Sequence, residues 1–337
     1  MPDRYFSRKS ELWQRRQLLK LGLAGIGIAG VGVAGQQLSR SSYDQFKAVK
    51  VPPIPENLPR AGNKISPLVM LREFDYGTVK QENGRTIREF RMKAGTGTLQ
   101  LNSAVSFITW NFNDRVPGPT LRATEGDRVR VIFLNQGGHA HTMHFHGVHP
   151  AEMDGVHPIR NGNATIYEFD ATPYGVHLYH CHTAPVTRHI GKGLYGMFII
   201  DPPAGRPPAD EMVLIMAGYD VNDDQRNELY AFNGLPHYYM HYPIPIQQEQ
   251  LVRLYVLNMI ELDPAVSFHL HANFFQVYPT GMTLHPREKA DIITMGTAER
   301  HILEFSFRYP GRYMFHPHQD AIAESGCMGQ FEVIGKA

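Results

Sequence analysis

Histidine pairs of the form His-x-His are the most unusual feature of this sequence. The 337-residue chain contains 18 histidines, and random placement would give roughly one such pair. It has five: His139/His141, His144/His146, His180/His182, His269/His271 and His316/His318. Alternate residues of a β-strand point to the same face, so each pair can present two imidazoles side by side. Because neutral imidazole is the commonest transition-metal ligand in proteins, the pairs predict metal sites.

Four of the five pairs occur at matching positions in two halves of the chain. In each half, one pair lies in an early strand-like segment, and a second pair ends a later aromatic-rich segment. The segments that lead into the second pairs, residues 173–180 and 309–316, both contain Pro, Gly and Tyr. This repetition predicts a duplicated domain whose pairs converge on shared metal sites. A single pair is equally explained by surface or core histidines, but four matched pairs favour ligands.

Cys181 lies between two of these histidines, His180 and His182. A thiolate beside imidazoles favours a metal such as copper. On a strand, the cysteine points to the opposite face, so it can serve a mononuclear site while its neighbours serve another. His141 and His189 can supply two further imidazoles, and one thiolate with two imidazoles is the pattern of blue-copper electron-transfer sites. A buried apolar thiol is the alternative for a lone cysteine.

Strand-like segments predict an all-β fold of two sandwiches, since no long amphipathic helical pattern occurs. The segments are rich in β-branched and aromatic residues and cover residues 86–92, 103–112, 128–134, 165–169, 195–200, 212–216, 251–257, 274–278, 302–307 and 330–334. Residues 201–208 (Asp-Pro-Pro-Ala-Gly-Arg-Pro-Pro) form the strongest break and predict a semi-rigid spacer. We therefore expect domains at residues 66–205 and 206–337.

The first forty residues resemble an export signal. The paired arginines Arg15 and Arg16 precede an apolar, Gly- and Ala-rich run over residues 21–35, as in a twin-arginine signal. The run of about fifteen residues is shorter than the roughly twenty needed to span a bilayer. We expect residues 1–40 to be a signal peptide, residues 41–65 a linker or extended arm, and the protein periplasmic or extracellular. An uncleaved membrane anchor is the alternative.

Charge and cysteine content argue against several other classes. A net charge of +1 gives no reason to expect nucleic acid or an anionic membrane as a partner. Charged residues make up 19% of the chain, which fits a folded globular protein. With only two cysteines, Cys181 and Cys327, there is no disulfide framework.

The motifs around these residues resemble those of multicopper oxidases. The resemblance rests on four segments: His141-x-x-His144-x-His146-Gly147, His180-Cys181-His182, His189-x4-Leu194, and residues 117–127 (Pro-Gly-Pro-Thr-Leu-Arg-Ala-Thr-Glu-Gly-Asp). It covers nearly all of residues 65–337 and implies two cupredoxin-like Greek-key β-sandwich domains. It also implies an enzyme that oxidises a reducing substrate one electron at a time and reduces O2 to water. Four coppers per chain are implied, one of type 1, one of type 2 and two of type 3.

The resemblance implies a type 1 copper held by three residues of the first half: His141, Cys181 and His189. The family's axial position, five residues after the last of these, holds Leu194. In the second half, Val266 and Pro317 stand where the first histidine and the cysteine of such a site would lie. The second half therefore cannot form a type 1 site, which matches two-domain oxidases with their blue copper in the N-terminal domain.

The resemblance also implies a three-copper cluster built by both halves. Its type 2 copper takes His144 and His269. Its type 3 pair takes six histidines: His146, His180, His182, His271, His316 and His318. Two-domain relatives form trimers of six cupredoxin domains. We therefore expect a homotrimer in which domain 1 of one chain meets domain 2 of the next and completes a cluster at each interface.

Acidic residues near the pairs are candidates for proton transfer. Asp154 resembles the family's acidic residue beside the type 2 copper, where a carboxylate can orient a bound ligand and relay protons. A turn aspartate before Gly155 is the alternative. Asp320 and Glu324, which follow the last pair, are further candidates. Cys327 lies near the missing second type 1 site, and we interpret it as a buried free thiol.

Two other functions are possible. Copper nitrite reductases share two cupredoxin domains, but they have an aspartate where this chain has His144 and lack a histidine at the position of His182. A non-catalytic periplasmic copper-binding protein is the second alternative, although an electron-transfer site joined to a cluster exceeds what storage requires. The reductant is also left open by the sequence: a phenol-like compound, an aromatic amine, a metal ion or a redox protein.

Overall fold

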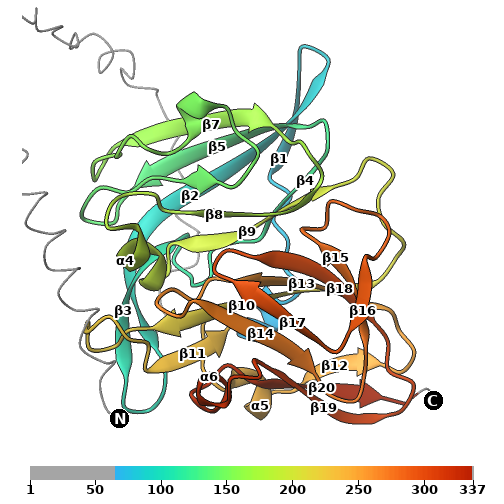
Figure 1. Ribbon diagram of the computed structural model, residues 1–337. Coiled ribbons are helices and arrows are strands. Elements are labelled where there is room, and N and C mark those ends of the chain that lie inside the picture. Colours follow the sequence, from blue (N-terminus) through green and yellow to red (C-terminus); the bar gives the residue numbers. More distant parts are fainter. Residues whose placement is uncertain (1–64, 336–337) are drawn as a thin grey trace, which may run out of the picture. The chain divides into compact units, whose positions relative to one another are not determined.

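The computed structural model describes residues 65–335 (Figure 1). The predicted signal peptide over residues 1–40, and nearly all of the predicted linker, lie outside the described residues. The first half forms two sheets. One has the order β1 (Thr78–Glu82), β2 (Arg85–Gln100), β5 (Arg128–Asn135), β7 (Ala164–Asp170), with β3 (Ser106–Phe112) also paired to β2. The other has the order β4 (Leu121–Thr124), β9 (Tyr195–Asp201), β8 (Gly175–His180), β6 (His144–Phe145).

The second half forms two further sheets. One has the order β11 (Leu229–Phe232), β10 (Asp210–Tyr219), β13 (Val252–Asn258), β18 (Arg300–Phe305), β15 (Phe275–Pro279), β16 (Glu288–Ala290). The other has the order β12 (Ile244–Gln247), β20 (Gly329–Ile334), β19 (Gly311–His316), β14 (Ala265–Leu270), β17 (Ile292–Gly296). The all-β prediction is confirmed.

Helices are short within the described part of the chain. They are α3 (Pro67–Met70), the 3-10 turn η1 (Ala151–Met153), α4 (Val186–Gly191), α5 (Tyr238–His241) and α6 (Asp320–Glu324). Over residues 65–335, no helix combines the length and the apolar character needed to cross a bilayer.

The strands of the first half are buried on one face or on both, depending on whether their sheet packs against one hydrophobic core or two. Strand β7 alternates, with Thr165, Tyr167 and Phe169 inside and Glu168 outside, as expected for a sheet with one wet face. Strand β8 is buried at every position and β9 at all but its last. One face of this sheet packs on the first sandwich core, and the other shares a core with β10 and β13 of the second half. The strand that ends at His180 is thus held from both sides.

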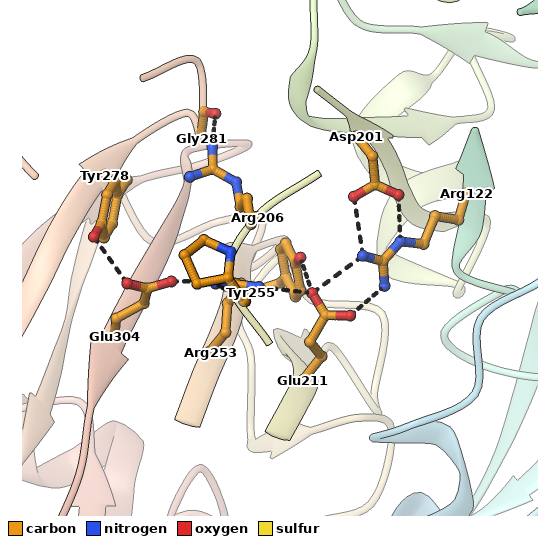
Figure 2. A network of polar contacts seen from close by, with 10 residues as sticks. Arg122, Asp201, Arg206, Glu211, Arg253, Tyr255, Tyr278, Gly281 and Glu304 are labelled. Carbon is orange, nitrogen blue, oxygen red and sulfur yellow. Dashed lines mark hydrogen bonds and ion pairs between the residues drawn. The ribbon is translucent and has the colours of Figure 1, made fainter. Parts of the chain in front are cut away.

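A buried network of charged side chains also joins the two halves (Figure 2). Arg122 of β4 donates to Asp201 at 2.7 and 2.9 Å and to Glu211 of β10 at 2.7 and 3.1 Å. Arg253 of β13 donates to Glu304 at 2.7 Å and to the same Glu211 at 3.2 Å. The two arginine side chains are only 8% and 2% exposed. Buried charges need such partners, so the network fixes both halves to each other.

The segment between β9 and β10 is tied down by hydrogen bonds at several points. The Arg206 guanidinium donates to the carbonyls of Gly281 and Thr283. Arg253 donates to the carbonyl of Pro207 at 2.8 Å. These contacts, together with its prolines, restrict the motion of the connection.

Candidate metal centre

Three buried side chains from separate elements converge beside the end of β8. Cys181 directly follows β8, His189 lies on α4, and His141 forms an isolated bridge with Ile159. The Sγ atom of Cys181 lies 3.1 Å from Nδ1 of His189 and 3.7 Å from Nδ1 of His141, and the two Nδ1 atoms are 3.2 Å apart. Cys181 and His141 are 0% exposed and His189 is 2% exposed. We name these three residues the Cys181 site.

Helix α4 and its surroundings explain how His189 reaches the cysteine. The helix folds the chain back, and Leu194 then accepts a hydrogen bond from Cys181 N at 3.0 Å. Leu194 is fully buried in the same apolar core as the cysteine. A Cβ atom at Gly137 would lie 2.4 Å from the His141 ring. Only glycine allows the backbone to approach that imidazole so closely.

The donor set of the Cys181 site fits one transition-metal ion. Nitrogen and sulfur ligands bind a metal such as zinc at roughly 2.0–2.3 Å, so three donors spaced 3.1–3.7 Å apart can share a single ion. Burial lowers the pKa of His141 to about 3 and that of His189 to about 4. Both imidazoles are therefore neutral near pH 7, with a ring nitrogen free for a metal. One soft sulfur with two imidazoles is a copper-type donor set.

Four histidines form a second cluster, which includes the two sequence neighbours of Cys181. We name His144, His146, His180 and His182 the first quartet. The Nε2 atoms of His146 and His180 lie 2.9 Å apart, and His144 stacks on His182 with ring centroids separated by 5.0 Å. Burial lowers the pKa of His146 to about 3 and that of His180 to about 4. His146 and His180 are therefore neutral near pH 7, and the contacts place all four rings in one region.

The second half repeats this arrangement. We name His269, His271, His316 and His318 the second quartet. The Nε2 atoms of His271 and His316 lie 2.9 Å apart, as in the first quartet. The strand register is also equivalent, because His269 is paired with His316 just as His144 is paired with His180. The two halves of the chain therefore carry equivalent sets of four imidazoles.

Backbone carbonyls orient the imidazoles of both quartets. His180 Nδ1 bonds the carbonyl of Cys181 at 2.9 Å, and His316 Nδ1 bonds the carbonyl of Pro317 at 2.7 Å. A hydrogen bond from one ring nitrogen fixes the tautomer and leaves the other nitrogen for a metal. His177 adds a further support, because its ring nitrogens lie 3.1 and 2.9 Å from the carbonyls of His146 and Pro173.

An aspartate lies beside one histidine of each quartet. His144 Nδ1 lies 3.0 Å from the Asp154 carbonyl and 3.1 Å from its carboxylate. His269 Nδ1 lies 2.8 Å from the Asp291 carbonyl and 3.9 Å from its carboxylate. Gly155, with φ of 74°, allows the first contact, since a Cβ there would lie 2.3 Å from the Met143 carbonyl. Asp154 is thus both a turn residue and a partner of His144.

Asp291 and His149 were not among the residues that the sequence motifs pointed to. Asp291 reaches His269 because β14 pairs with β17, which begins at the next residue. His149 Nε2 lies 3.4 Å from the Asp154 carboxylate. No spacing rule links Asp291 to the second quartet, and only the strand pairing could have revealed it.

The remaining predicted acidic residues lie apart from these contacts. Asp320 and Glu324 are exposed on α6, and among the described residues neither forms a hydrogen bond or ion pair with a quartet histidine. Val266 and Cys327 are fully buried in the apolar core of the second half. Burial raises the pKa of the Cys327 thiol well above its usual value. In the second half, apolar packing therefore occupies the region that corresponds to the Cys181 site of the first half.

The two quartets do not touch within one chain. Ring contacts join histidines inside each quartet, and over residues 65–335 none joins the first quartet to the second. His318 is exposed. Within the described part of one chain, the quartets are therefore two separate groups of four imidazoles.

Two β-sandwiches with a buried set of one cysteine and two histidines, and with imidazole clusters beside it, define a cupredoxin-like copper protein. The chain belongs to the multicopper oxidase family: one multicopper oxidase family model matches residues 93–205 and a second matches residues 206–336. It is therefore an oxidoreductase with O2 as acceptor, as the motifs predicted.

Three similar proteins illustrate the relationship. A crystal structure of a multicopper oxidase is 49% identical, with a TM-score of 0.79 over 82% of this chain and 98% of the other. The copper-containing nitrite reductase of Neisseria gonorrhoeae is 27% identical over 270 residues, which are 73% of this chain and 68% of the reductase. Laccase-24 of Oryza sativa subsp. japonica is 28% identical over 188 residues, 50% of this chain and 32% of the laccase.

Proposed function

We propose that this multicopper oxidase holds four coppers per chain: one type 1 at the Cys181 site, and one type 2 with two type 3 in clusters built from the quartets. The observation that carries the proposal is the equivalence of the two quartets, with a 2.9 Å Nε2–Nε2 separation in each. His144 and His269, the two histidines with an aspartate partner, are assigned to the type 2 copper. The other six histidines are assigned to the type 3 pair.

The chain links the two kinds of site through Cys181. The cysteine belongs to the mononuclear set, while its sequence neighbours His180 and His182 belong to the first quartet. Copper bound there would cycle between two oxidation states and so transfer single electrons. The short covalent path from Cys181 to its neighbours would carry four such electrons, one at a time, toward the site where O2 is reduced.

Asp154 and Asp291 are proposed to assist proton delivery. The Asp154 side chain is 35% exposed and the Asp291 side chain 47%, so each carboxylate contacts both solvent and a quartet histidine. Such a carboxylate can orient the imidazole and pass protons from water. Reduction of one O2 to two waters consumes four protons, so this supply is required in every turnover.

We propose that the quartets meet between chains in a homotrimer. The quartets are separate groups within the described part of one chain, and the connection between the halves is fixed by hydrogen bonds and by the buried Arg122–Glu211 contact. These contacts oppose a rotation of one half against the other that would bring the two quartets of one chain together. A closed ring of three chains would instead bring the first quartet of one chain to the second quartet of the next. The solved structure of a copper nitrite reductase shares the fold of this chain.

Mixed trimers would test this assembly directly. A His146→Ala chain lacks a first-quartet ligand, and a His316→Ala chain lacks a second-quartet ligand, so neither homotrimer should take up O2 at the parent rate. If clusters form between chains, co-expression of the two variants creates interfaces with two intact quartets, and part of the O2 uptake should return. No recovery in mixed trimers, isolated through a different affinity tag on each variant, would assign the cluster to a single chain.

The overall reaction is tested by its stoichiometry. One O2 should disappear for every four molecules of a one-electron donor oxidised, and nitrite should not be reduced. Nitrite reduction without O2 uptake would favour the reductase alternative, and absence of both in copper-loaded protein would favour copper binding alone. We also propose export by the twin-arginine-type leader, which a fusion of residues 1–40 to a reporter would test through twin-arginine-dependent export.

A further inference from the structure

The imidazoles of the Cys181 site are shielded from solvent. His141 is 0% exposed and His189 only 2%. A dissolved donor therefore cannot stack on either ring. Because electron transfer weakens steeply with distance, electrons must reach this site through the residues that cover it.

Two aromatic side chains form that cover. The centroid of the Trp110 ring lies 4.7 Å from that of His189 and 5.8 Å from that of His141. Both contacts are edge-to-face. The His139 ring lies 4.1 Å from Trp110 and 4.4 Å from His141. Trp110 is partly exposed and His139 is exposed. Each of them thus contacts both solvent and a histidine of the Cys181 site.

The backbone holds Trp110 in this position. Trp110 N donates to the carbonyl of Lys192, just after the helix that carries His189, at 3.0 Å. Gly193, with φ of 114°, lets the two segments approach each other. A Cβ there would lie 3.0 Å from the Trp110 carbonyl and 2.5 Å from Val116. The tryptophan and the imidazole are therefore positioned by the same loop.

The outer surface at this point suits a planar, largely apolar molecule. Ile108, two residues before Trp110 on the same face of β3, is 62% exposed. Together with the rings of Trp110 and His139 it offers apolar and aromatic area, on which an aromatic ring packs edge-to-face or offset-stacked.

We propose that Trp110, with His139 beside it, is the contact through which a phenol-like donor transfers electrons to the Cys181 site. The proposal rests on the type 1 site of the proposed function. Each phenol loses one electron through these rings and one hydroxyl proton to bulk water, and leaves as a phenoxyl radical. The electron reduces the metal held by Cys181, and four such events supply the electrons that one O2 takes up.

Contact with the donor is tested without copper. Trp13 and Trp110 are the two tryptophans of the chain, so in a Trp13→Phe chain all tryptophan emission comes from Trp110. Titration of copper-free protein with 2,6-dimethoxyphenol should quench this emission along a saturable curve, and His139→Leu should weaken the binding. Quenching that rises only linearly, as with free N-acetyltryptophanamide, would overturn the proposal.

Electron transfer is tested by the anaerobic rate of bleaching of the blue absorption. With the phenol, Trp110→Leu should bleach about tenfold more slowly, since an aromatic contact is lost, and Trp110→Phe should restore most of the rate. Reduction by hexacyanoferrate(II), which does not stack, should change much less. Tyr309→Leu, which removes an exposed aromatic ring of the second half, should bleach at the parent rate with both donors.

Three outcomes of the rate measurements would also overturn the proposal. An unchanged phenol rate in Trp110→Leu removes Trp110 from the path. An equal loss with both donors, together with a shifted blue absorption, makes Trp110 a structural support only. An unchanged phenol rate with slower reduction by a cytochrome assigns this surface to a protein partner. Absence of blue absorption in the parent protein is a failure of the proposed function instead, and the fluorescence titration still decides whether the phenol contacts Trp110.

Discussion

The Sγ atom of Cys181 lies 3.1 Å from Nδ1 of His189, although the two residues lie on different elements, one after strand β8 and the other on helix α4. The helix folds the chain back over the end of the strand, and Leu194 closes the loop by accepting from Cys181 N. A single loop of the chain therefore brings together Cys181, the imidazole of His189 and Leu194.

Leu194→Met should lower the reduction potential of the Cys181 site. A leucine donates no electron pair to copper, whereas a thioether can act as an axial ligand, and the axial ligand tunes the potential of such sites. Redox titration of the blue absorption measures the change. Leu178→Met, a buried leucine in a different core cluster, is the matched control and should keep the parent potential. An unchanged or raised potential in Leu194→Met would remove this residue from the site.

Asp154→Asn should slow the reaction of reduced enzyme with O2 by about tenfold to a hundredfold, the usual effect of losing a carboxylate that supports a metal ligand. Reduction of the Cys181 site by the donor should stay nearly unchanged, because Asp154 contacts His144 and His149 rather than that site. Asp291→Asn should have the same selectivity. Stopped-flow reoxidation measures both, with Asp170→Asn, at a half-exposed position, as control. Parent rates across the pH range would reduce Asp154 to a turn residue.

Much of this arrangement could be predicted from the sequence, because it depends on local periodicity. The paired histidines and the strands around them follow from alternation along single segments. Asp291 could not be predicted, since its contact with His269 exists only through the pairing of β14 with β17. Trp110 was missed for the same reason, because its neighbour His189 lies far along the chain on a helix too short to give a periodic signal.

Strand β2 shows where local propensity is insufficient. The sequence predicts a strand over residues 86–92, but β2 continues to Gln100. The added part contains Gly95 and Gly97, which weaken a strand pattern. Its partner supplies the missing stability: residues 94–100 pair with β3, whereas the first part of β2 pairs with β5.

Copper-free protein should lose stability as the pH falls below about 6.5, the ordinary pKa of histidine. Burial lowers the folded-state pKa of His141 and His146 to about 3 and that of His180 and His189 to about 4. Between these values the unfolded chain binds more protons than the folded chain. The free energy of unfolding should therefore be lower at pH 5.0 than at pH 7.5 by at least about 1 kcal/mol.

Urea unfolding of copper-free protein at both pH values measures this loss. His146→Gln should reduce the difference between pH 7.5 and 5.0, because one depressed pKa is removed. His285→Gln, at an exposed position, should leave the difference as in the parent. Equal stability of the parent at both pH values would contradict the burial of neutral imidazoles.

Arg122→Leu should lower the free energy of unfolding by about 3–5 kcal/mol, because it removes the buried arginine partner of Asp201 and one of the two arginine partners of Glu211. Arg85→Leu removes an ion pair of two half-exposed side chains and should cost less than about 1 kcal/mol. Denaturant unfolding of the two variants compares them. Equal, small losses would show that the network in Figure 2 contributes little to joining the halves.

Copper per chain, measured in fully loaded parent protein and in Cys181→Ser, tests the central claim most directly. The account predicts four coppers in the parent and three in the variant, because the serine removes the Cys181 site and leaves both histidine quartets intact. Two coppers in the parent and one in the variant would contradict a three-copper cluster and favour a reductase-type pair of single-copper sites.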